Sequence, residues 1–194
     1  GLRYNYDKKI ANYDRKTYGG LQTTDPALIA LKNGVYTNQT FDVNADDGNL
    51  SGQLALRYRI NPKINTYANY SISYKPIGIN VGGLPTANGA VLTELAEVRP
   101  EAVNYYEIGI KTNPTRNSIL NFNIYLNDIK DYQTQVQTPE PGVNRGYLAN
   151  AEKVQVKGFE LDGSLNIGYF LRINGAFAYT DAKYKKFTNA PVPL

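Results

Sequence analysis

Residues 50–60, which read LSGQLALRYRI, decide the fold class of this chain. Serine, glutamine, alanine and two arginines stand at the odd positions of this stretch. Apart from one glycine, the even positions carry Leu50, Leu54, Leu56, Tyr58 and Ile60. Successive side chains of a β-strand point to opposite faces of its sheet. The alternation therefore predicts a strand with one apolar face and one polar face.

The same alternation recurs in segments that are joined by short turns, so we predict β-hairpins wherever two such segments flank a few turn-forming residues. The first hairpin returns at Asn61-Pro62-Lys63 with the same sidedness. One irregularity is the switch of the apolar phase at Gly158, which predicts a β-bulge there. The predicted strands are 2–10, 50–60, 64–75, 103–111, 118–137, 154–165 and 171–179.

Long connections alternate with the short turns. Residues 15–49, 76–99 and 138–149 are rich in Gly, Pro, Asn, Thr and Asp without a sustained period, so we expect loops there. Residues 118–137 alternate over roughly 65 Å at ~3.3 Å per residue, far beyond an ordinary strand. Long strands with short turns at one end and long loops at the other are typical of outer-membrane barrels. The sequence thus predicts an all-β, antiparallel transmembrane β-barrel, of which about seven strands are present.

The ends of the apolar runs support the membrane interpretation. Asp128 and Lys130 continue the apolar phase of their strand, and a lysine facing lipid at mid-bilayer costs about 2–4 kcal/mol, so we expect both beyond the apolar band. Tyrosines stand near the ends of several runs, as at membrane–water interfaces, although ordinary cross-strand aromatic pairs would look the same. These are Tyr74, Tyr106 and Tyr132 near outer ends and Tyr58 near an inner end.

The composition excludes most familiar chemistry. With no Cys and no His, the chain lacks thiolate metal sites, disulfides and the usual general base. The net charge of +4 is spread along the chain, so no nucleic-acid partner is expected. No stretch approaches the roughly 18 apolar residues that a spanning helix needs, and the mean hydropathy is −0.45. Spanning helices are thereby excluded, but barrel strands are not, because they expose only alternate side chains to lipid. Without Met or a leader-like segment, the chain is expected to be an internal or processed piece.

Several segments resemble TonB-dependent outer-membrane receptors, and their order is similar to the second half of the receptor barrel. Residues 50–80 fit this resemblance more loosely. The segments are Arg99-Pro100-Glu101, Tyr106-Glu107-Ile108-Gly109-Ile110-Lys111, Asp128 with Asp131-Tyr132-Gln133, Asn150-Ala151 with Gly158-Phe159-Glu160-Leu161-Asp162, and 178–184 with Phe187 and Ala190-Pro191.

The resemblance implies a plugged barrel of about 22 strands in the bacterial outer membrane. It implies a receptor that takes up a scarce nutrient, most often an iron–siderophore complex, with a TonB complex acting through the plug. It implies no enzymatic activity and no cofactor. Residues 1–194 would be part of one barrel domain, without the plug and the final strands. A passive porin-like channel and a soluble β-rich binding module stay open as alternatives.

Two groups of residues are candidate sites. In the loop at 138–149, Asn144, Arg145 and Tyr147 offer a cation and an aromatic ring to a small-molecule ligand such as a ferric chelate, although packing between loops is the alternative. The alternation of the strands predicts that a second group of side chains faces the lumen. In a plugged barrel we expect these side chains to contact the plug and water more often than a substrate. This group is Arg57, Arg59, Glu107, Lys111, Glu160 and Asp162.

Two further patterns carry weaker hypotheses. Glu160 and Asp162 could form the carboxylate pair of a glycosidase, but a role as lumen-facing polar residues is favoured. Asp42, Asn44 and Asp46 resemble the start of a calcium loop. The glycine of that pattern falls one position late and no Glu closes it, so we expect a solvated acidic loop without metal.

Overall fold

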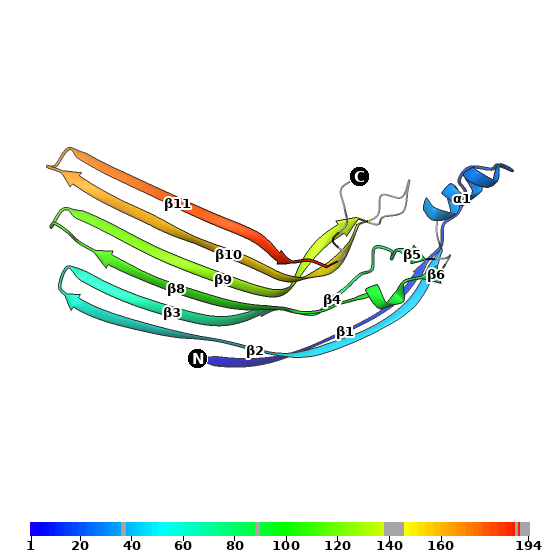
Figure 1. The fold of residues 1–194 in the computed structure, drawn as a ribbon, viewed down its shortest axis with the longest axis horizontal. Coiled ribbons are helices and arrows are strands. Elements are labelled where there is room, and N and C mark those ends of the chain that lie inside the picture. Colours follow the sequence, from blue (N-terminus) through cyan, green and yellow to red (C-terminus); the bar gives the residue numbers. More distant parts are fainter. Residues whose placement is uncertain (36–37, 88–89, 138–145, 189, 191–194) are drawn as a thin grey trace.

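The computed structural model describes residues 1–35, 38–87, 90–137, 146–188 and 190 (Figure 1). Seven long strands form one antiparallel sheet in which each strand pairs with its neighbours along the chain. This confirms the all-β class and the seven strands. They are β1 (Leu2–Arg15), β2 (Gln39–Asn61), β3 (Ile64–Lys75), β8 (Glu101–Thr112), β9 (Ser118–Gln137), β10 (Gly146–Ile167) and β11 (Leu171–Lys186).

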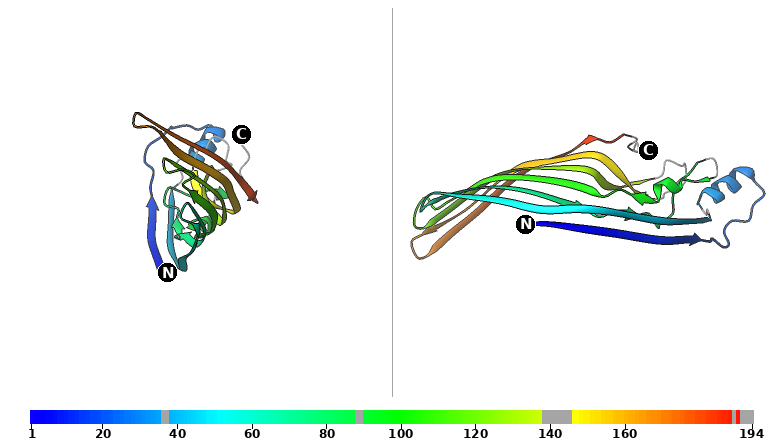
Figure 2. Two further views of the ribbon diagram at one scale, coloured as in Figure 1. Left: turned by 90° about the vertical axis from the view of Figure 1, so that its left-hand side faces the viewer. Right: turned by 90° about the horizontal axis from the view of Figure 1, so that it is seen from below.

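The sheet is open and curved, with its short connections gathered at one end (Figure 1, Figure 2). The hairpin turns β2–β3, β8–β9 and β10–β11 lie at this end, which we call the turn end. The β1–β2 and β3–β8 connections lie at the opposite end, which we call the loop end. The predicted asymmetry of short turns and long loops is therefore present. Among the described residues, no helix is long and apolar enough to cross a membrane.

The strand register places the predicted apolar side chains on one face of the sheet, which we call the apolar face. In one row across the strands, Leu56 lies opposite Ala68, Ala68 opposite Ile108, and Ile108 opposite Ile124. The row continues through Phe159, whose ring stacks at 5.8 Å on Tyr179. Many of these side chains are exposed in this chain, as expected of a face that meets lipid.

The opposite face, which we call the polar face, is covered near the loop end. Strand β2 begins at Gln39 and pairs with β1 up to Arg15, so the expected loop at 15–49 was wrong over residues 39–49. Residues 41–45 alternate as well, but here the apolar side chains Phe41, Val43 and Ala45 lie in the polar-face phase. They are buried because the connection at 76–99 packs on them.

The connection at 76–99 is ordered by short elements. Its strands are β4 (Gly78–Ile79), β5 (Thr86–Ala87), β6 (Ala90–Val91) and β7 (Glu97–Val98), with a short 3-10 helix, η1 (Thr93–Leu95). Ile77, Leu84 and Ala96 complete the buried cluster with the three residues of β2. The β1–β2 connection contains the helix α1 (Pro26–Val35). Asp25 caps the start of this helix, because its Oδ1 accepts a hydrogen bond from the Ala27 amide at 2.8 Å.

The predicted bulge at Gly158 was wrong, because Gly158 pairs regularly with Tyr125 and Thr180. The register shift lies instead between Lys153 and Val154. The apolar phase switches because Val154 and Val156 lie on the polar face near the loop end, where Val154 belongs to a second buried cluster and Val156 packs against it. A Cβ at Gly158 would collide with the backbone oxygen of Tyr179 and the Tyr125 hydroxyl, which explains the glycine.

The tyrosine positions are only partly as expected. Tyr106 packs on Tyr70 of β3 at 5.0 Å, which is a cross-strand aromatic pair on the exposed apolar face. Tyr132 was expected at an interface, but it packs on the buried cluster of Ile129, Ala151 and Val154. Asp131, with its positive φ of 53°, interrupts the alternation just before Tyr132 and explains the difference.

Candidate functional site

The six side chains predicted to face the lumen all lie on the polar face. One row of the sheet runs from Arg57 through Tyr67, Gly109 and Asn123 to Glu160. The next row toward the turn end contains Arg59, Lys111 and Asp162, and Glu107 lies one row the other way. The polar face thus carries cations and carboxylates within two or three rows of one another.

Glu107 is held by two phenols. The Tyr67 hydroxyl donates to Oε1, and the Tyr105 hydroxyl donates to Oε2 at 3.0 Å. The Lys111 ammonium lies 5.5 Å from the centre of the Tyr67 ring, a cation–π contact. Gly109 makes room for this ring, since a Cβ there would meet its atoms. Glu107 is therefore a fixed acceptor on an otherwise open wall.

Glu160 and Asp162 accept hydrogen bonds from amides of the neighbouring strand. Asn123 Nδ2 donates to Glu160 Oε2 at 3.1 Å, and Asn121 Nδ2 donates to Asp162 Oδ2 at 2.9 Å. Both carboxylates are thus paired with neutral donors across β9 and β10. This arrangement is a wall of hydrogen-bonding groups.

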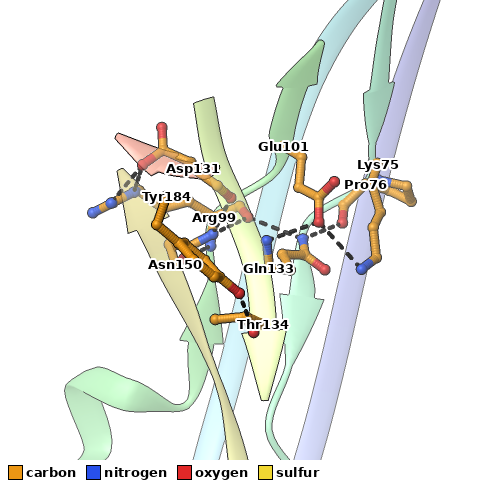
Figure 3. A network of polar contacts seen from close by, with 9 residues as sticks. All are labelled: Lys75, Pro76, Arg99, Glu101, Asp131, Gln133, Thr134, Asn150 and Tyr184. Atoms are coloured by element: carbon orange, nitrogen blue, oxygen red, sulfur yellow. Dashed lines mark hydrogen bonds and ion pairs between the residues drawn. The ribbon is translucent and has the colours of Figure 1, made fainter. Parts of the chain in front are cut away.

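A denser polar network lies near the loop end (Figure 3). Glu101 is almost fully buried, and its Oε1 accepts from the Gln133 backbone amide at 2.7 Å and from Lys75 Nζ at 3.3 Å. Gln133 Nε2 in turn donates to the backbone oxygens of Pro76 and Arg99, each at 3.0 Å. These bonds tie both ends of the 76–99 connection to β8 and β9.

Asn150 and Asp131 fix the same connection from the other side. Asn150 Nδ2 donates to the Arg99 oxygen at 2.9 Å and to the Asp131 oxygen at 2.6 Å. Its Oδ1 accepts from the Arg99 amide at 3.0 Å, and Arg99 Nη2 lies 2.6 Å from Asp131 Oδ1 (Figure 3). Asp131, whose backbone has a positive φ of 53°, is thus bonded to both Asn150 and Arg99.

Two more amide side chains pair with backbone groups as a β-strand would. Asn80 accepts from the Leu148 amide at 2.8 Å and donates to the Leu148 oxygen at 2.9 Å. Gln39, which is 1% exposed, makes the same reciprocal pair with Leu84, at 2.8 and 2.7 Å. The 76–99 connection is therefore a fixed part of the wall at the loop end.

Comparison with known proteins identifies the architecture. The profile described as "TonB dependent receptor-like, beta-barrel" matches residues 1–193, almost the whole chain. The chain belongs to the TonB-dependent receptor β-barrel family. Proteins of this family reside in the bacterial outer membrane and are transporters, not enzymes, so neither a soluble module nor a glycosidase describes this chain.

Two relatives of this TonB-dependent receptor barrel are named as a metal-pseudopaline receptor and a ferrioxamine B receptor. The metal-pseudopaline receptor CntO of Pseudomonas aeruginosa is 30% identical over 137 residues, which cover 71% of this chain and 17% of that protein. The ferrioxamine B receptor of Salmonella typhimurium is 26% identical over 142 residues, covering 73% and 18%. The chain thus spans less than a fifth of the length of these relatives.

Solved structures show the same fold. The ferric yersiniabactin uptake receptor FyuA from Yersinia pestis matches with a TM-score of 0.62 at 21% identity, over 96% of this chain and 24% of that one. The copper transporter OprC matches with a TM-score of 0.63 at 14% identity, over 80% and 24%. In outer-membrane barrels the short turns face the periplasm and the long loops face outward, which orients the turn end and the loop end.

The family motifs meet in the network at the loop end. Arg99 and Glu101 of the first segment contact Gln133 and Asp131 of the third and Asn150 of the fourth. The sequence singled out these residues, but only through the resemblance. The contributions of Asn80 and Gln39 were missed, because both amides stand in segments that were read as loops.

The predicted ligand residues are only partly described. Asn144 and Arg145 lie outside the described residues. Tyr147 lies near the start of β10 at the loop end, opposite Val136, and partial burial raises the pKa of its hydroxyl above the usual value. It adjoins Leu148, whose backbone is bonded to Asn80, so Tyr147 stands where β10 meets the 76–99 connection.

The calcium-like segment is part of β2 and not a loop. Asp42, Asn44 and Asp46 alternate along a straight ladder with β1, so the chain does not wrap around an ion there. Asp42 Oδ1 accepts from Asn12 Nδ2 and Asp46 Oδ2 accepts from the Tyr6 hydroxyl, both at 2.7 Å. In the part of the chain that the structure describes, no group of three or more acidic residues is placed to hold a metal ion.

Proposed function

We propose that this barrel belongs to a receptor that takes up a metal–chelate complex, of the siderophore class, by TonB-dependent active transport. The observation that carries the proposal is the family match over residues 1–193, together with relatives named as receptors for metal–pseudopaline and ferrioxamine B. A passive porin-like channel receives no support from these relatives.

The polar face is proposed to contact the plug of the whole protein. Its anchored Glu107, paired Glu160 and Asp162, and the cations Arg57 and Lys111 offer charged and hydrogen-bonding groups to a polar partner. A plug in the lumen needs such a wall, because it must be held in place and still be released when TonB pulls on it. The energy-coupling step itself belongs to parts beyond this chain.

The ligand is proposed to meet the loop end at Asn144, Arg145 and Tyr147. Arg145 would supply a positive charge for an anionic chelate, and Tyr147 would supply a ring and a hydroxyl. The fixed joint between Asn80 and Leu148 supports this proposal, because it holds the neighbouring backbone of Tyr147 in one position. A preorganised contact loses less conformational entropy on binding.

Uptake measurements test the proposal. Cells that carry the full-length receptor as their only chelate receptor would be given radioiron-loaded ferrioxamine B and radiometal-loaded pseudopaline. We expect accumulation of at least one of the two, and its loss when either the receptor gene or the tonB gene is deleted. Accumulation that is independent of TonB would overturn the active-transport proposal and would favour a passive channel. No accumulation of either chelate would overturn the proposed ligand class.

A further inference from the structure

Five lysines gather on the apolar-face side of β9, β10 and β11, immediately beyond the apolar band toward the loop end. We call them the lysine platform: Lys130, Lys153, Lys157, Lys183 and Lys186. Lys153 lies directly opposite both Lys130 and Lys186, so three lysine residues form one row across three strands. Their neighbours Ile129 and Val154 are buried on the other face, which places Lys130 and Lys153 on this one.

The register gives the level of the lysine platform relative to the lipid. The last row that is apolar on all three strands is Ile124, Phe159 and Tyr179. Lys157 stands one row further, between Leu126 and Asp181, followed by Lys183 and then by the three-lysine row. Two residues along a strand span ~6.7 Å, or about 5 Å along the bilayer normal at a tilt of ~40°. The headgroup region is roughly 5–8 Å deep in each leaflet. Lys157 therefore stands at headgroup depth, and the flexible side chains of the next two rows can reach back toward it.

The charges of the lysine platform are not balanced by its own acids. Lys153 lies 4.0 Å from Asp128, Lys183 lies 2.9 Å from Asp181, and Lys186 lies 3.8 Å from Glu152. Three carboxylates facing five lysines leave an excess of two positive charges. Lys185 adds another cation nearby. It has no partner residue in the β10–β11 ladder, because Tyr184 pairs with Val154 and Lys186 pairs with Lys153.

The lysine side chains remain accessible. Those of Lys153, Lys183 and Lys186 are 46%, 62% and 67% exposed. Like charges directly opposite each other destabilise a sheet, so the row of Lys130, Lys153 and Lys186 favours an anion that sits between its members. The surface is continuous with the lipid-facing band, so the anion that reaches it at this depth is a lipid headgroup.

We propose that the lysine platform binds the phosphate groups of an anionic lipid in the outward-facing leaflet of the membrane. Ammonium groups form charge-assisted hydrogen bonds with phosphate oxygens, and a lysine near an anionic membrane surface strengthens binding about fivefold. The site would fix the rotation and depth of the barrel at β9–β11. It is independent of the chelate that the receptor transports.

The test uses the full-length receptor purified in a non-ionic detergent and titrated with bisphosphorylated lipid A, its monophosphoryl form or phosphatidylcholine. Bound lipid is counted and its Kd measured by native mass spectrometry. The test variant combines K153Q, K157Q and K183Q. A control variant combines K9Q, K32Q and K63Q, which remove the same charge elsewhere on the chain.

We expect the bisphosphorylated lipid to bind most tightly, and the test variant to weaken it at least tenfold while the control variant changes it less than twofold. Equal binding by both variants would overturn the proposal, and so would equal affinity for phosphatidylcholine. Competition by millimolar inorganic phosphate that matches the lipid in strength would also overturn it, because the site would then take free phosphate and not a headgroup. Unchanged heat-induced unfolding of the test variant would show that the loss is not due to misfolding.

Discussion

The Asn80 side chain and the Leu148 backbone form a reciprocal pair of hydrogen bonds, with Leu148 N donating to Asn80 Oδ1 at 2.8 Å and Asn80 Nδ2 donating to the Leu148 oxygen at 2.9 Å. The same Nδ2 also donates to the Leu95 oxygen at 2.8 Å. One amide therefore joins the 76–99 connection to the first residues of β10. The wall at the loop end is held by side chains where the backbone ladder does not reach.

Replacing Asn80 by alanine is expected to loosen this joint. The Leu148 amide and two carbonyl groups would lose their partner, and each buried unpaired group costs about 1–3 kcal/mol. We expect hydrogen exchange of the full-length receptor to accelerate at Leu148 and across 77–98 while the strands near the turn end keep their protection. Asn69→Ala is the control, since the Asn69 side chain accepts an exposed hydrogen bond from Gln53. Unchanged exchange at Leu148 would contradict the role given to Asn80.

Glu101 is expected to be needed as an acceptor more than as a charge. Glu101→Ala leaves the buried Gln133 amide without a partner and should lower the free energy of unfolding by about 2–3 kcal/mol. Glu101→Gln keeps an oxygen for that amide and loses only the contact with the half-exposed Lys75, so its cost should stay below about 1 kcal/mol. Urea unfolding of the receptor in detergent measures both. Equal losses in the two variants would mean that the charge dominates.

The glycines of the strands give a sharper test of packing. In Gly158→Ala the new Cβ meets the backbone oxygen of Tyr179, which cannot turn aside, so we expect a loss of at least ~2 kcal/mol or poor assembly of the barrel. Gly175→Ala on β11 is the matched control, because none of the described residues has an atom within 4 Å of a Cβ there. It should be neutral or slightly stabilising, since alanine restricts the unfolded chain. The two variants can be compared by heat-induced unfolding in detergent.

The sequence predicts the strands of the sheet better than it predicts the side-chain contacts that attach the 76–99 connection to them. Period-two alternation located all seven strands and placed Glu107 and Glu160 on one face, because alternation reports directly which side of a strand a residue faces. It failed at 39–49, where the apolar residues are buried under a connection instead of facing lipid, so the phase changes without a break in the strand. It could not find Asn80, because an amide that bonds backbone groups leaves no periodic signal.

The alternation also misplaced the irregularity of β10. A switch of apolar phase has two physical causes: an extra residue in the strand, or a change in what covers each face. At Gly158 the second cause applies, since the buried cluster with Val154 covers the polar face from there toward the loop end. Only the position of neighbouring segments distinguishes the two causes, and a single sequence does not contain it.

Glu152, beyond the apolar band at the loop end, gives a prediction for pH. Hydrogen bonds from Thr188 and the nearby Lys186 ammonium lower the pKa of Glu152 to about 2 from an ordinary value of 4.5. A carboxylate with a lowered pKa in the folded state stabilises that state above its unfolded pKa, and this contribution is lost as the pH falls toward the folded pKa. The tie between β10 and the segment after β11 should therefore be complete above about pH 5 and weaken progressively between pH 4.5 and 2.

The measurement is the difference in unfolding midpoint between the receptor and its Glu152→Gln variant as a function of pH. We expect the receptor to be the more stable of the two at pH 6 and the difference to shrink toward zero near pH 2, because the protonated acid then resembles the amide. Glu94→Gln, in the 3-10 helix of the 76–99 connection, is the control for the loss of one carboxylate elsewhere in the chain. A difference that stays constant down to pH 2 would show that the carboxylate charge of Glu152 does not hold Thr188, and that the neutral hydrogen bond alone closes this end of β11.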